Sequence, residues 1–158
     1  MMRSDPAGLV KTFATLRVVG DRLVPAEVTR ILKIIPTRAY AKGETYHGGE
    51  RTGDLVGKIG VWYFATDRVV ASNDLADHLI FLANLLGGSS PEAVPLTRLH
   101  ALLKKKSLGA VVSCFWYGGA GAKPPVVPRA IAEFLRLLPA EIETDFDADE
   151  EPEARRFA

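Results

Sequence analysis

The chain is organised around one apolar run, Gly109-Ala-Val-Val-Ser-Cys-Phe-Trp-Tyr-Gly118. In an extended strand successive side chains point to opposite faces, so both faces of this run are apolar and Ser113 is its one polar member. A strand without a polar face belongs inside a sheet that is covered above and below. Glycines bracket the run as turn residues. The sequence therefore predicts a central strand over residues 110–117 that is buried on both faces.

Composition places the chain among ordinary globular proteins. Its 158 residues are 47% hydrophobic and 25% charged, with a net charge of +1 at pH 7. This length suits one domain with its own hydrophobic core. A net charge near zero gives no electrostatic reason to expect nucleic acid or an anionic membrane as a partner. Cys114 is the only cysteine, which excludes an internal disulfide and favours a reducing, cytoplasmic location.

The order of apolar and polar residues predicts an α+β domain over residues 12–148. It would lie between a flexible N-terminal tail, 1–11, and an acidic, disordered C-terminal tail, 149–158. The N-terminus has no apolar signal-peptide core, and no apolar run is long enough to span a bilayer. Besides the central strand, the predicted strands are 12–19, 37–46, 58–66 and 141–147, and the predicted helices are 25–35, 75–86, 96–106 and 128–138. In the first helix an apolar stripe is expected to end at Ile35.

Two of the predicted helices share a pattern that indicates an internal duplication. Residues 24–36 align without a gap with residues 127–139, and Val, Pro, Leu and Pro coincide, although convergence of two Pro-bounded helices would give a similar match. Two strand–helix–strand units with their first strands adjacent make a ferredoxin-like, split βαβ sheet. The central strands would be 12–19 and 110–117. The full predicted order is 141–147, 12–19, 110–117, 37–46, 58–66.

This strand order makes two further predictions. Arg17 would lie beside Glu143 and Asp145 on the neighbouring strand. The two repeat helices would cover only one face of the sheet, so helices 75–86 and 96–106 are expected to cover the other. If they do not, that face is a dimer or ligand surface.

Residue types that carry chemistry in other proteins have simpler interpretations here. Cys114 lies inside a strand without a cationic neighbour in sequence, which is typical of a buried apolar side chain. Asp74 and His78 have the spacing of two metal ligands, but no third ligand follows, and Asp74 reads as a helix-start residue. Residues 118–121 form a Gly-rich loop without the G-K-[ST] of a phosphate loop. We therefore expect no catalytic residues, no metal and no cofactor. These residues favour a protein without enzymatic activity but leave a small enzyme as an alternative.

The remaining candidates for function are arginine and aromatic side chains on the predicted strands. They are Arg17, Arg38, Tyr40, Trp62, Trp116 and Tyr117. Our first hypothesis is a non-catalytic interaction module that binds a protein partner or a second copy of itself through the open end of the sheet and the loops 42–53 and 118–125. One alternative is a small-ligand sensor or small enzyme with a pocket near Arg17, Arg38, Trp62 and Trp116. The other is an RNA-binding sheet, for which the RNP1 pattern is missing.

Several segments together resemble the uncharacterised bacterial proteins grouped as domain-of-unknown-function family 4279. The resemblance spans about residues 12–147 and rests on residues 14–21, 25–32, 36–43, 60–62, 77–79 and 113–117. Val24 and Tyr40 depart from residues common in the family, where an acidic residue and Trp are frequent. The resemblance implies no activity and no catalytic residues. Such proteins occur near toxin–immunity loci, so it implies an immunity-like interaction role.

Overall fold

The computed structural model describes residues 10–48, 53–88 and 93–148, and these form a mixed α+β fold as predicted. The strands are β1 (Val10–Gly20), β2 (Arg38–Tyr40), β3 (Thr45–His47), β4 (Asp54–Val56), β5 (Gly60–Ala65), β6 (Gly109–Gly118) and β7 (Ala140–Ala148). The helices are α1 (Pro25–Leu32), α2 (Leu75–Leu85), α3 (Val94–Lys106) and α4 (Arg129–Leu135), with a 3-10 turn, η2 (Thr66–Arg68). The predicted tails lie outside the described residues, except that Val10 and Lys11 begin β1.

The main sheet has the strand order β2-β5-β1-β6-β7. The predicted central pair is confirmed, because β1 and β6 are antiparallel neighbours from Val10 opposite Gly118 to Val19 opposite Gly109. The rest of the order differs from the predicted ferredoxin-like one. The connection through α4 joins two adjacent parallel strands, β6 and β7. The connection through α1 joins β1 to β2, which are not adjacent because β5 lies between them. Arg17 is therefore separated from β7 by β6 and lies opposite Tyr63 and Val111, not beside Glu143 and Asp145.

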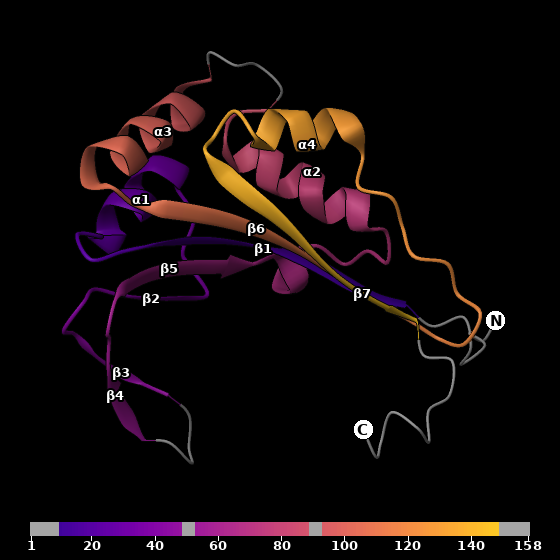
Figure 1. Ribbon diagram of the computed structural model, residues 1–158, viewed down its shortest axis with the longest axis horizontal. Coiled ribbons are helices and arrows are strands. Elements are labelled where there is room, and N and C mark those ends of the chain that lie inside the picture. Colours follow the sequence, from indigo (N-terminus) through magenta and orange to yellow (C-terminus); the bar gives the residue numbers. More distant parts are fainter. Residues whose placement is uncertain (1–9, 49–52, 89–92, 149–158) are drawn as a thin grey trace.

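The four α-helices found in the described residues all pack on one face of the sheet (Figure 1). The sheet residues beneath them, including Ala14, Leu16, Trp62, Val112 and Cys114, are almost completely buried. The expectation that helices 75–86 and 96–106 cover the opposite face is wrong: α2 packs on β1 and β6 from the same side as α4, and α3 packs on α1. The central strand is accordingly buried on one face only, since Val111 and Phe115 are half-buried and Tyr117 is exposed.

Helix α1 is shorter than its apolar pattern predicts. The helix ends at Leu32, and Lys33 adopts a left-handed conformation with φ of 57°. The turn after it no longer follows the helical period. Val28 and Leu32 are buried as expected, whereas Ile35, predicted to extend the apolar stripe, is 82% exposed.

A small hairpin, β3–β4, interrupts the predicted second strand. The chain turns at residues 41–44, where Gly43 has φ of +84°, and Thr45–His47 then pairs with Asp54–Val56 instead of extending β2. The hairpin is held to the main sheet by Tyr46, whose ring stacks on Tyr40 at 3.9 Å. Only the short β2 remains as the edge partner of β5.

Candidate functional site

The face of the sheet away from the helices, which we call the open face, carries rows of side chains set by strand register. Arg38 lies opposite Tyr63, and Tyr63 lies opposite Arg17, across β2, β5 and β1. Directly paired residues in a sheet share a face. Two arginines therefore flank one tyrosine on the open face, and we call this set the Arg–Tyr–Arg row.

A hollow of about 450 Å³ lies over the Arg–Tyr–Arg row. Arg68, from the 3-10 turn, contributes a third guanidinium group, and Tyr40 and Thr37 lie at the β2 side. Among the described residues, none that lines the hollow carries a carboxylate. Within the described parts of the chain, none of the three arginines lies in an ion pair, whereas Lys106, Lys42 and Arg129 each have a carboxylate partner.

Both tyrosines of the hollow keep their protons at neutral pH. Burial raises the pKa of Tyr63, and so does the charge of Asp67, while Arg17 and Arg38 act in the opposite direction. Burial likewise raises the pKa of Tyr40, helped by its hydrogen bond with Tyr46. The Tyr63 hydroxyl therefore keeps a proton that it can donate beside the arginines, whereas the hydroxyl of Tyr40 is engaged with Tyr46.

Aromatic side chains occupy the centre of the open face. Phe13 on β1 and Phe115 on β6 stack directly opposite each other, with ring centroids 4.6 Å apart. The next row pairs Lys11 with Tyr117, which is 40% exposed. A half-buried apolar strip therefore runs along the two central strands.

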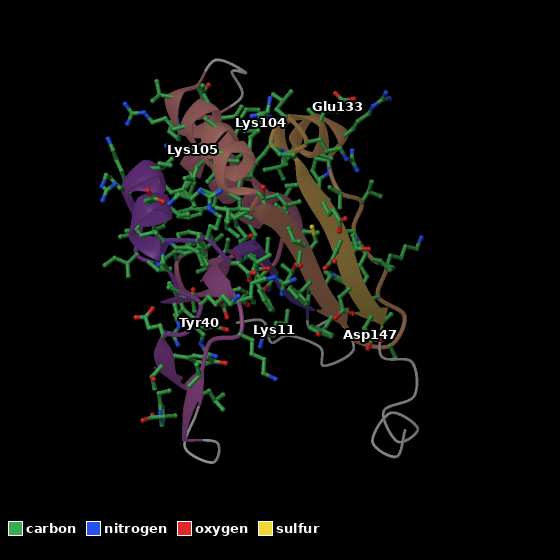
Figure 2. The ribbon with its side chains drawn as sticks, turned by 60° about the vertical axis from the view of Figure 1, so that its left-hand side comes forward. Lys11, Tyr40, Lys104, Lys105, Glu133 and Asp147 are labelled. Carbon is green, nitrogen blue, oxygen red and sulfur yellow. The ribbon has the colours of Figure 1, made fainter. Side chains whose placement is uncertain are left out.

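The strand β7 gives the open face an acidic edge. Its outward side chains are Glu141, Glu143, Asp145 and Asp147, as the alternation in the sequence predicts. Glu143 accepts a hydrogen bond from Ser113 at 3.3 Å. Figure 2 shows Tyr40, Lys11 and Asp147 on the side opposite Lys104, Lys105 and Glu133, which belong to the helical layer. The open face therefore runs from arginines on one side, through aromatic rings, to carboxylates on the other.

Comparison of the sequence with models of protein families shows which family the chain belongs to. The sequence model of a family described as a domain of unknown function (DUF4279) matches residues 10–149. The chain belongs to the DUF4279 family. No curated protein matches it. No solved structure matches it either. The match includes every strand of the main sheet, so the open face lies wholly within the DUF4279 domain.

The six residues singled out from the sequence are divided between the two faces of the DUF4279 domain. Arg17, Arg38 and Tyr40 meet at the hollow, and Tyr117 lies on the same face but in the row of Lys11 and Asp147. Trp62 and Trp116 are 0% and 4% exposed on the helix side. There Trp62 Nε1 donates to Oγ1 of Thr29 at 3.0 Å, and Trp116 packs edge-on against Phe146. The pocket near the arginines therefore has no tryptophan in its lining.

The lining of the hollow includes four residues that were not selected as site residues from the sequence: Thr37, Val61, Tyr63 and Arg68. Tyr63 follows Trp62 in the strand, so alternation indicates that it lies on the opposite face, but only the pairing of β5 with β1 brings it beside Arg17. Arg68 lies in a 3-10 turn beyond the end of β5, and no periodic pattern indicates where such a residue points.

The other candidates for chemistry in the DUF4279 domain have structural roles. Cys114 is fully buried, and burial raises the pKa of its thiol to about 11. Asp74 is the N-cap of α2, where its carboxylate accepts from the backbone N–H of Ala76, as predicted. His78 is buried between Thr66 and the carbonyl of Ser72. Within residues 10–48, 53–88 and 93–148, no three His, Cys, Asp or Glu residues are grouped to hold a metal ion.

No described helix combines the length and apolar character needed to cross a bilayer.

Proposed function

We propose that this DUF4279 domain is a non-catalytic module that binds a protein partner on the open face of its sheet. The observation that carries the proposal is the placement of all four α-helices on the other face. It leaves Phe13, Phe115 and Tyr117 without a covering helix in the described part of the chain. An apolar patch with aromatic residues and a charged rim is typical of a protein interface.

The two charged sides of the open face specify the partner's chemistry. Strands β2 and β7 are four strand spacings apart, or about 19 Å. A complementary partner carries acidic groups over the arginines and basic groups over the β7 carboxylates, with an apolar surface between them. Charge complementarity of this kind mainly sets specificity and association rate.

A second copy of the chain is the alternative partner. A two-fold axis that lies above the open face and parallel to β1 would place β7 of one copy over β2 of the other. Each acidic edge would then meet the arginines of the other copy.

RNA fits the open face less well, because the β7 carboxylates would repel a polyanion. The immunity-like role, with a toxin as the partner, has only the family resemblance in its support. A cytoplasmic location has the single, unpaired cysteine in its support.

Site-specific photo-crosslinking tests the proposed face in the cells that produce the protein. A photoreactive amino acid would replace Tyr117 on the open face or, as a control, Ile80 on α2, because these two side chains are 40% and 43% exposed. We expect a defined protein adduct from position 117 and none from position 80. The captured protein, once purified, should bind the wild-type chain and should lose at least about tenfold in affinity for Phe115→Lys.

Three outcomes distinguish the alternatives. An adduct of twice the chain's own mass, with a dimer of the wild type that Phe115→Lys dissociates, identifies a second copy as the partner. An adduct that nuclease removes contradicts the proposal in favour of RNA. Equal crosslinking from positions 117 and 80, or an unchanged affinity of Phe115→Lys, contradicts the open face as the binding surface.

A further inference from the structure

We propose that the hollow over the Arg–Tyr–Arg row is a binding site for an oxyanion, a carboxylate or phosphate group, held between Arg17, Arg38 and Arg68. The group comes either from a small organic anion or from an acidic side chain of the protein partner. If the oxyanion belongs to a small organic anion, the hollow is a ligand site that is independent of the protein interface. If it belongs to an acidic side chain of the protein partner, the hollow is part of the interface proposed above, and the inference then rests on that proposed function.

The positions of the arginines favour one shared ligand. Arg17 and Arg38 lie in one register row with a single strand between them, so their Cα atoms are about 10 Å apart. Arg68 reaches the same hollow from the turn that follows β5. Long side chains from three elements thus border one space, and a group above Tyr63 can contact more than one guanidinium.

The electrostatics of the hollow favour an anion. Three like charges around one space repel each other, and the part of the lining that the structure describes contains no carboxylate to offset them. The charge of Asp67 acts on Tyr63, but Asp67 lines a different hollow, with Lys11. Arginine has five N–H donors in a fixed fork that matches the two oxygens of a carboxylate or phosphate.

The floor and rim of the hollow are held in place before any ligand arrives. Thr37 donates its backbone N–H to the carbonyl of Tyr63, and its hydroxyl accepts from the backbone N–H of Ala65 at 2.9 Å. Tyr40 is fixed by its stack on Tyr46. Side chains that are positioned in advance lose less entropy on binding. The volume of about 450 Å³ lies in the range of small-molecule sites, and the tyrosine rings suit a ligand with a flat apolar body.

The test is an NMR titration of the full chain at low ionic strength with phenyl phosphate and with benzoate, and with phenol as the uncharged control. We expect both anions to shift the backbone amides of Arg17, Arg38 and Tyr63, and phenol to leave them unchanged. Arg17→Gln and Arg38→Gln should each weaken binding about tenfold, since a charged hydrogen bond is lost. Lys104→Gln removes the same charge from the helical layer and should change affinity less than twofold. The arginines are exposed, so these variants should retain the wild-type melting temperature.

The results separate this site from the protein-binding proposal and separate its two sources. If the wild type binds the free anions and the arginine variants bind them about tenfold more weakly, a small molecule is supported as the source of the oxyanion. If no anion shifts these amides, but the purified partner binds Arg38→Gln about tenfold more weakly than Lys104→Gln, the partner supplies the oxyanion. If neither the anions nor the partner distinguishes Arg38→Gln from Lys104→Gln, the proposal is wrong, even when Phe115→Lys still abolishes partner binding. Displacement of phenyl phosphate by RNA, with affinity rising with its length, would also overturn it.

Discussion

Oγ1 of Thr66 lies 2.6 Å from Nδ1 of His78, and both side chains are buried. The same hydroxyl oxygen accepts the backbone N–H of Ala14 at 3.0 Å. A carbonyl oxygen can only accept, so Nε2 of His78 donates to the carbonyl of Ser72 at 2.9 Å. In the neutral imidazole Nδ1 then accepts the hydroxyl proton of Thr66. This chain of hydrogen bonds ties the middle of β1 to the 3-10 turn and to α2.

Substitution of Thr66 by Val should break this chain while keeping the volume of the side chain. The N–H of Ala14 and Nδ1 of His78 would be left buried without partners, and the free energy of unfolding should fall by about 2–4 kcal/mol. Urea denaturation at neutral pH measures the change. Thr97→Val, at an exposed position on α3, is the control and should change stability by less than about 0.5 kcal/mol. Equal stabilities of the two variants would contradict the structural role assigned to Thr66.

The ion pair between Glu27 and Lys106 should stabilise the packing of α1 on α3. Nζ of Lys106 lies 2.7 Å from Oε1 of Glu27, and their side chains are only 16% and 32% exposed. Each charge also complements its own helix end, because Glu27 lies in the first turn of α1 and Lys106 in the last turn of α3. A double-mutant cycle with Glu27→Gln and Lys106→Met should give a coupling energy of about 1 kcal/mol or more.

The exposed pair of Arg129 and Glu133 provides the control for that cycle. Its side chains are 91% and 62% exposed and four residues apart in α4. Its coupling energy should not exceed about 0.5 kcal/mol and should disappear in high salt. Equal coupling energies for the two pairs would show that burial does not strengthen the Glu27–Lys106 contact.

The buried thiol of Cys114 should make the fold less stable at high pH. Its pKa rises from 9.0 to about 11 on folding, because burial disfavours the thiolate. Above pH 9 the thiol of the unfolded chain loses its proton, whereas the thiol of the folded chain keeps it. The free energy of unfolding therefore decreases as pH rises towards 11. The stability advantage of the wild type over Cys114→Ala should shrink by about 1.4 kcal/mol for each pH unit across this window. Tyrosines are common to both chains and cancel in the difference.

Thiol labelling gives an independent measurement of the same burial. At neutral pH iodoacetamide should modify Cys114 only after denaturant unfolds the chain, because the thiol is both inaccessible and protonated. Rapid labelling of the native protein would contradict this prediction.

Substitution of Gly60 by Ala should be severe, because of close backbone contacts at the start of β5. A Cβ atom there would lie 2.7 Å from the carbonyl oxygen of Gly20 and 2.8 Å from Cβ of Leu23. We expect a loss of stability of about 2 kcal/mol or more, measured by thermal or urea unfolding. Gly109→Ala is the matched control, since its Cβ would meet only Val19, at 3.8 Å, and it should be close to neutral.

The local elements of this fold were predictable from residue patterns, and the long-range order was only partly so. Alternation located β1, β6 and β7, and helical periodicity located α2 and α3. The Pro-bounded helices indicated two connections between strands, but such a helix does not reveal which strand lies beneath its path. Whether a connection spans a strand, as α1 spans β5, depends on packing between distant segments.

The open face shows why the candidate site was only partly predictable. Val111 and Phe115 look like core residues, and an apolar residue on an uncovered face has the same sequence signature as one beneath a helix. Arg17 and Arg38 were selected for their residue type, yet only the register of β5 between β1 and β2 brings them to one hollow. Trp62 and Trp116 were grouped with them because aromatic residues suit both cores and interfaces.

The pairing of β1 with β6 also shapes how the molecule is assembled in time. The hydroxyl of Thr12 donates to the carbonyl of Phe115, across a sequence separation of 103 residues. Pairings this distant give a high contact order, which slows folding to about the millisecond-to-second range. During synthesis the edge of β1 that pairs with β6 stays unsatisfied until residue 118 has left the ribosome. The period before residue 118 emerges is therefore the one in which the nascent chain most needs protection by chaperones.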